Sequence, residues 1–175
     1  MGFPHATIDI PGDHKQLQEE LQSLVFHNEL SAQLLDGLNG GVAVPGHMCA
    51  TAWVMTHDRS HILLVQHQLL GWSSPGGHMY PHETTRDGAV RELHEETGIH
   101  ASQVTDVLVA PAIIHVSDVP GDQPHRHWNV SWFFTVDRDV PLLPDHEATW
   151  WPCNALPDGP TDLVPTVKLL LSTRV

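Results

Sequence analysis

The stretch GGHMYPHETTRDGAVRELHEETGI, residues 76–99, carries the pattern that decides the fold. Its second half predicts a helix over residues 84–96, because Gly98 follows where a helix C-cap belongs. Three of its glutamates lie within about 100° of arc on that helix: Glu92, Glu95 and Glu96. Carboxylates at this spacing repel one another by a few tenths of a kcal/mol per exposed pair. The cluster is therefore either a solvated acidic face or a site for a positive charge.

A divalent cation is the positive charge that fits this cluster best. Three carboxylates from one helix face offer hard oxygen ligands, which suit Mg²⁺ or Mn²⁺ rather than zinc. Arg91 stands four residues before Glu95 and can pair with it. Upstream, residues 75–77 read Pro-Gly-Gly, a tight turn where backbone groups can approach a ligand closely. Since Mg²⁺ commonly bridges to substrate phosphates, the stretch predicts a phosphate-processing metal site.

The spacing of these residues resembles a complete Nudix box. The fixed positions are Gly77, Glu83, Arg91-Glu92-Leu93, Glu95-Glu96 and Gly98-Ile99, and none departs from the family pattern. Chance matching at this spacing has a probability on the order of 10⁻⁸ per start position. The resemblance extends over roughly residues 47 to 172, from a predicted hairpin at 48–67 to a closing segment around Trp150 and Pro157.

The order of predicted elements agrees with the fold that the resemblance implies. Strands, a helix, further strands and a last helix predict an α/β fold with a mixed sheet between helical layers. The resemblance implies a Nudix-type α/β/α sandwich over residues 46–175. Residues 1–45 lie outside it and are expected to form an N-terminal helical extension.

Hydrophobic spacing and turn residues place the individual elements. One or two amphipathic helices are expected over 13–38, with Asp13 as N-cap and a stop at 40–41. They would pack either on the main domain or on a second subunit, and in the second case they would be a dimerisation element. The remaining expected elements are strands over 48–56, 61–67, 104–116 and 127–136, a loop over 117–126, and a helix over 161–171 capped by Thr161.

Charge and composition limit the partners of the chain. With 21 acidic against 8 basic residues the formal net charge is −13, which repels nucleic acid. No apolar run approaches the roughly 18 residues of a membrane span, no secretory signal is visible, and the two cysteines are too few for a disulfide framework. The 15 histidines are most simply a compositional bias. A cytoplasmic protein with a small phosphorylated substrate, without nucleic-acid or membrane partners, is expected.

The resemblance implies an activity and assigns roles by position. Nudix enzymes hydrolyse a nucleoside diphosphate linked to another moiety, by water attack at phosphorus with a divalent metal as cofactor, here Mg²⁺ or Mn²⁺. Arg91 would be an orienting partner of the metal site. The implied metal contacts are Glu92, Glu95 and Glu96, the Gly76 carbonyl, and Glu83 as an outer or water-mediated contact.

The general base stays open at this point, because the family places it differently in different members. Glu92 is one candidate, since helix geometry puts it near the metal. A carboxylate outside the box is the other, with Glu147 or Asp145 best placed by sequence order.

Substrate-reading residues are expected outside the box glutamates. Gly77 and His78 belong to the Gly-Gly-His stretch at 76–78, and Arg126 offers one of only eight cations for a phosphate, with a surface ion pair as the alternative. Trp128 is a candidate for stacking on a base or sugar, although an alternating aromatic strand more often lies in a core. A zinc site formed by His115, His125 and His127 is a weaker hypothesis, because no fourth ligand stands at a spacing typical of zinc sites.

Two other classes of function stay open. A Nudix-fold isomerase acting on isoprenyl diphosphates would need a catalytic cysteine near the site, and Cys49 is the feature that keeps it open. A non-catalytic sensor of a nucleotide derivative is less compatible with an intact box. The sequence does not choose among nucleoside diphosphate derivatives, because the box residues act on the diphosphate common to all.

Overall fold

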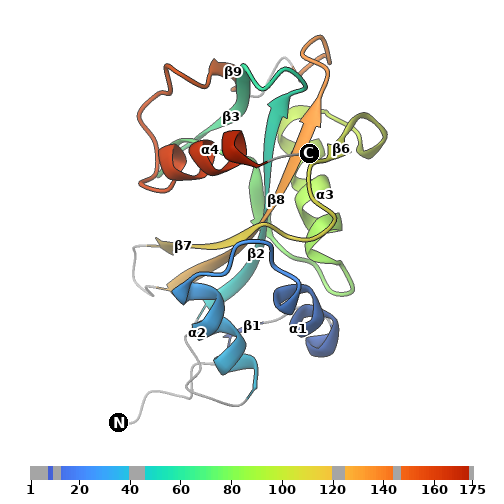
Figure 1. Ribbon diagram of the computed structural model, residues 1–175, viewed down its shortest axis with the longest axis vertical. Coiled ribbons are helices and arrows are strands. Elements are labelled where there is room, and N and C mark those ends of the chain that lie inside the picture. The colour runs from blue at the N-terminus through green and yellow to red at the C-terminus, as the bar shows by residue number, and fades with distance from the viewer. Residues whose placement is uncertain (1–7, 10–12, 40–45, 120–124, 144–146, 174–175) are drawn as a thin grey trace.

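A computed structural model describes residues 8–9, 13–39, 46–119, 125–143 and 147–173 of the chain (Figure 1). Within these ranges no helix is both long and apolar enough to cross a bilayer. The elements that carry the site are the central strands and one helix.

The centre of the fold is a mixed sheet built on two long parallel strands (Figure 1). These are β2 (Gly46–Thr56) and β8 (His125–Val136), paired in register along β2. β3 (His61–His67) joins β2, and β7 (Ile113–Val119) joins β8, both antiparallel. The shorter strands are β1 (Ile8–Asp9), β4 (Gly71–Ser73), β5 (Gly76–His78), β6 (Thr105–Asp106) and β9 (Ala148–Pro152).

Helices cover both faces of the two central strands, as expected for an α/β/α sandwich (Figure 1). α3 (Thr85–Thr97) packs on one face and α4 (Leu163–Ser172) on the other. The alternation predicted for β8 is confirmed, because one core cluster holds all the residues expected to share one face of the strand: Trp128, Val130, Trp132, Phe134 and Val136. Phe133, between them, lies in the cluster under α4.

α3 begins and ends one residue later than the expected 84–96, and the predicted cap Gly98 follows its last residue. The Thr84 hydroxyl accepts a hydrogen bond from the Asp87 N–H at 3.0 Å, which satisfies a free donor of the first turn. Gly98 adopts φ of 82°, a left-handed conformation that glycine takes without strain, and its N–H donates to the His94 carbonyl. Leu93 points into the core, so the glutamates of the helix face the other way.

The N-terminal segment forms two helices that lie beside the ends of the long strands (Figure 1). They are α1 (His14–Gln22), with the predicted cap Asp13, and α2 (Glu29–Leu38). Leucines of both helices enter the same core cluster as α3. The segment therefore packs on the main domain, and its division from it at residue 46 stays a prediction, as does dimerisation.

Three details differ from the expectations. The strand expected over 104–116 is split into β6 and β7, because the chain between them contacts β8 only through single hydrogen bonds and contains Pro111, which cannot donate. The loop expected over 117–126 is shorter, since β7 continues to Val119 and β8 starts at His125. α4 follows Asp162 rather than Thr161. The expected helix stop at 40–41 lies outside the described residues.

Candidate active site

Two box glutamates lie against the short strand β5. The Gly76 N–H donates to the Glu96 carboxylate at 3.1 Å. A Cβ added at Gly77 would lie 2.6–2.7 Å from the Glu92 carboxylate, well inside van der Waals contact. Glycine at position 77 therefore lets the carboxylate of α3 rest on the backbone of β5. Glu95 lies one turn from Glu92 and is more exposed.

Burial makes the negative charge of this cluster costly. It raises the pKa of Glu96 to about 7, and the neighbouring carboxylates Glu92 and Glu95 add to the shift. Burial also raises the pKa of Glu92, although Arg91 opposes the shift. A divalent cation between these carboxylates would reverse the balance, because an opposite charge nearby favours the ionised form.

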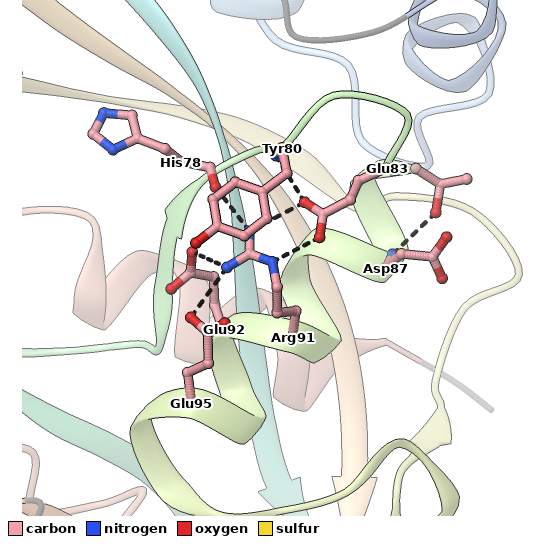
Figure 2. A network of polar contacts seen from close by, with 8 residues as sticks. His78, Tyr80, Glu83, Asp87, Arg91, Glu92 and Glu95 are labelled. Atoms are coloured by element: carbon pink, nitrogen blue, oxygen red, sulfur yellow. Dashed lines mark hydrogen bonds and ion pairs between the residues drawn. The ribbon is translucent and has the colours of Figure 1, made fainter.

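Arg91 links three carboxylates of the box (Figure 2). Its guanidinium donates to Glu83 at 2.6 Å, to Glu92 at 2.6 Å and to Glu95 at 3.2 Å. The predicted pairing with Glu95 is thus present, but Glu83 and Glu92 are the closer partners. A planar guanidinium carries five N–H donors that point in different directions, so one side chain can bind all three carboxylates.

Two further contacts fix the plane of the Arg91 guanidinium (Figure 2). It donates to the His78 backbone carbonyl at 2.8 Å, which ties α3 to β5. Its carbon also lies 3.9 Å from the centre of the Tyr80 ring, at cation–π distance. Sequence analysis did not single out Tyr80, although it is the only tyrosine in the chain.

Glu83 is held in its ionised form at the edge of the cluster. Partial burial raises the pKa of this carboxyl, but the hydrogen bonds from Arg91 and from the Tyr80 N–H outweigh it and lower the pKa overall. The Tyr80 N–H donates at 2.8 Å. Glu83 is therefore a fixed negative charge beside the three helix glutamates.

A cavity of about 420 Å³ opens on the α4 side of the sheet, next to β5. Gly76 and Gly77 line it, so the strand that carries the glutamates also borders the cavity. Several polar side chains on its wall were not predicted, among them Thr51, Asn129 and Ser131. They alternate with core residues along β2 and β8. Because alternate residues of a strand point to the same face of the sheet, this spacing could have predicted that they share a face.

Of the other two predicted substrate readers, the structure separates Trp128 from this cavity and leaves Arg126 at its rim. Trp128 is fully buried in the core on the α3 side, so the core interpretation of the aromatic strand holds and stacking on a ligand does not follow. Arg126 pairs with Asp118 at 3.2 Å, which is the surface ion pair named as the alternative. Asp118 itself lines the cavity, so this pair lies at its rim.

Glu147 lies just before β9 and has an exposed side chain. Its backbone carbonyl accepts a hydrogen bond from the Gln66 N–H at 2.9 Å. Among the contacts described for this part of the chain, none joins its carboxylate to the helix glutamates. Asp145 lies outside the described residues.

The three histidines of the zinc hypothesis are not brought together as a described set. His115 lies 3.3 Å from Asp162 and 3.1 Å from the Thr166 hydroxyl, both at the start of α4. His127 contacts His78 instead. The side chain of His125 lies outside the described residues.

Cys49 lines the cavity wall from β2 and is almost completely buried, with 1% of its surface exposed. Burial, with the nearby charge of Glu92, raises its pKa to about 12. The thiol is therefore neutral at pH 7 in the protein on its own.

Comparisons with known proteins agree with the geometry. A family model described as the NUDIX domain matches residues 46–170. No curated protein matches the chain closely enough to count as a relative.

Several solved structures share the fold. A NUDIX-family hydrolase from Clostridium perfringens aligns with a TM-score of 0.57 at 18% identity, covering 73% of this chain and 97% of that one. A MutT protein from Methanosarcina mazei Go1 aligns at 0.51 and 21%, covering 73% and 94%. The Nudix hydrolase RenU from M. smegmatis aligns at 0.51 and 19%, covering 74% and 88%. At these identities the likeness establishes the fold alone.

Proposed function

Because the chain belongs to the Nudix family, whose domain spans residues 46–170, we propose that it is a metal-dependent pyrophosphohydrolase. Its substrate is a nucleoside diphosphate linked to another moiety, or a related organic pyrophosphate. The observation that carries this proposal is the glutamate cluster of α3 resting on β5 beside a cavity of about 420 Å³.

The residues present fit a hard divalent cation. Glu92, Glu95 and Glu96 would hold Mg²⁺ or Mn²⁺ together with the Gly76 carbonyl, and Glu83 would contact it through water. The cation supplies charge that neutralises the diphosphate and lowers the pKa of attacking water. The net charge of −13 makes this neutralisation necessary for a phosphorylated substrate to enter.

Arg91 acts as a positioning residue in this proposal. It binds Glu83 and Glu92 at 2.6 Å and holds them at one end of the cluster. Its own charge also offsets part of the repulsion between the carboxylates before the cation arrives.

Glu92 is the proposed general base, with Glu147 as the alternative. Glu92 stands within the cluster, where Arg91 and the backbone of β5 hold its carboxylate in place beside the proposed cation. Glu147 would need to approach from the exposed end of β9. Replacing Glu147 by glutamine separates them: at saturating metal the acidic limb of the pH–rate profile should disappear if Glu147 is the base and persist if Glu92 is.

The cavity next to β5 is the proposed site for the moiety linked to the diphosphate. A volume of about 420 Å³ is in the usual range for small-molecule sites. Gly77 lines the cavity, His78 lies opposite the lining residue Cys49, and Arg126 stands near the rim with Asp118. The hydroxyl and amide groups of Thr51, Ser131 and Asn129 would read the ligand by hydrogen bonds.

The test is a substrate panel with Mg²⁺ or Mn²⁺: ADP-ribose, sugar nucleotides, dinucleoside polyphosphates and oxidised dNTPs, with products separated by chromatography. Hydrolysis in ¹⁸O-labelled water assigns the attacked phosphorus. Metal-dependent cleavage of one class is expected. Isopentenyl diphosphate is included, since its isomerisation would favour the isomerase. Tight binding of a nucleotide derivative without turnover would favour the sensor, and either result would overturn the hydrolase proposal.

A further inference from the structure

Two cross-strand pairs bring cysteine and histidine side chains together at one end of the cavity. Cys49 on β2 lies opposite His78 on β5, and His47 on β2 lies opposite His127 on β8. Residues 47 and 49 alternate with core positions and so share one face of β2. Directly opposed residues of neighbouring strands place their Cβ atoms about 4.5–5.5 Å apart. The register of three strands therefore gathers these side chains on one small patch.

The distances within the patch suit a single bound ion. One ligand atom each of Cys49, His78 and His127 lies within 4.8 Å of the others. The two histidine Nε2 atoms are 3.2 Å apart. Around tetrahedral zinc, with Zn–N of about 2.0–2.1 Å and Zn–S of about 2.3 Å, neighbouring ligand atoms lie about 3.3–3.7 Å apart. The histidine pair is already close to this spacing, and the sulfur lies within 4.8 Å of a ring nitrogen of each histidine.

The chemistry of this set differs from that of the box. A thiol and two imidazoles are softer ligands, which select zinc-like ions over Mg²⁺. The His78 ring points away from Arg91, whereas its backbone carbonyl accepts from Arg91 (Figure 2). One residue therefore contributes its main chain to the acidic network and its side chain to the patch, so the two sites adjoin without sharing a ligand side chain.

We propose that Cys49, His78 and His127 form a second metal site, specific for a zinc-class ion, at the cavity end of the sheet. The Cys49 thiol releases its proton to solvent when its sulfur coordinates the ion. Three protein ligands leave a fourth position open, and Cys49 and His127 line the cavity, so that position faces a bound ligand. The ring of His47 lies 5.1 Å from that of His78, next to the three proposed ligands.

Cobalt is the probe for this site, because a Co²⁺–thiolate bond gives a charge-transfer absorption in the near ultraviolet. The full chain is stripped with chelator and titrated with Co²⁺ in excess Mg²⁺. We expect the thiolate band to saturate at one equivalent and to be displaced by Zn²⁺. The zinc content after dialysis, measured by mass spectrometry, should also be one equivalent per chain.

Matched variants assign the ligands. Cys49→Ala should abolish the band, and His127→Gln should weaken Co²⁺ binding by more than about tenfold. Two control variants should leave the thiolate band and the Co²⁺ affinity unchanged. They are Cys153→Ala, at the other cysteine, and His57→Gln, at a histidine that pairs with Asp137. Glu96→Gln, in the box, should also leave the band in place.

The proposal fails if the folded wild-type protein gives no thiolate band, or if the band survives Cys49→Ala. It also fails if Cys153→Ala removes the band. Circular dichroism checks that each variant is folded. Should Cys49→Ala not fold, His127→Gln decides: unchanged Co²⁺ affinity in that variant overturns the site. None of these readouts depends on a pyrophosphohydrolase activity.

Discussion

Gly77 shows how one missing side chain makes room for the acidic cluster. The Glu92 carboxylate occupies the space that any Cβ at this position would take. Glycine is thus required here by close approach rather than by an unusual backbone angle.

We expect Gly77→Ala to lower turnover by more than about tenfold, because Glu92 must move away from β5, and misplacement of about 1 Å costs on the order of a hundredfold. Steady-state kinetics with Mg²⁺, together with thermal unfolding to confirm the fold, measure this. Wild-type turnover in the alanine variant would show that the position of Glu92 is not critical.

Arg91 and Arg86 form a matched pair of arginines for testing the orienting role. Arg86 makes a two-point contact with Asp106 at 2.7 and 2.8 Å, away from the glutamates, while Arg91 serves the cluster. Lysine keeps the charge but loses the planar fork. Arg91→Lys should raise the Mg²⁺ concentration needed for half-maximal turnover, and Arg86→Lys should not. Equal metal dependence in both variants would contradict the role.

The raised pKa of Glu96 gives a stability prediction with a definite sign. Between its ordinary value and about 7 the folded, metal-free protein binds more protons at this carboxyl than the unfolded chain. The contribution of Glu96 to stability is therefore full at low pH and is lost as pH rises through this window. Urea unfolding without metal should show this fall, and Glu96→Gln should reduce it. An identical pH slope in the variant would refute the shift.

At the scale of elements, α3 was predictable because its signals are local. Thr84, Gly98 and the spacing of Leu93 among polar residues all lie within one short stretch. The split of β6 from β7 was not predictable, since it depends on pairing with β8 and on the contacts of residues 107–112.

The cluster of Cys49, His78 and His127 was missed for the same reason. Its members come from three strands, and only the register of β2 with β5 and β8 joins them. Sequence spacing instead grouped His127 with His115, which the structure places next to α4.

α1 is fixed to the first turn of α3 by one carboxylate. Glu20 accepts a hydrogen bond from the Thr85 N–H at 3.0 Å and another from the Thr85 hydroxyl. The same hydroxyl accepts from the buried Trp132 indole N–H at 2.9 Å. This contact connects the N-terminal segment to the helix that carries the glutamates.

Glu20→Ala should lower the free energy of unfolding by about 1–3 kcal/mol, since a buried Thr85 N–H loses its partner. The control is Glu19→Ala, where only an exposed ion pair with Lys15 is lost and the change should stay below about 1 kcal/mol. Chemical denaturation measures both. Equal losses would mean that α1 docking does not depend on this carboxylate.

For the whole molecule, the sequence predicted the layers and the acidic helix but not the cavity. The box is contiguous, so the resemblance reaches its residues directly. The cavity is formed by β2, β7, β8 and the chain before β5 and α4, and its residues are scattered over the sequence. Its position next to Gly76 and Gly77 means that, in the proposed function, the variable moiety would bind and the diphosphate would be cleaved on two sides of one strand.

The most direct measurement is metal-dependent turnover of the best panel substrate by Glu95→Gln and by Glu96→Gln. Glu29→Gln, at an exposed position of α2, is the control. We expect each box variant to stay folded and to lose more activity than the roughly 10–100-fold typical of changes next to a metal ligand, with the control unchanged. Wild-type turnover in either box variant would contradict the assignment of these glutamates as the cation site.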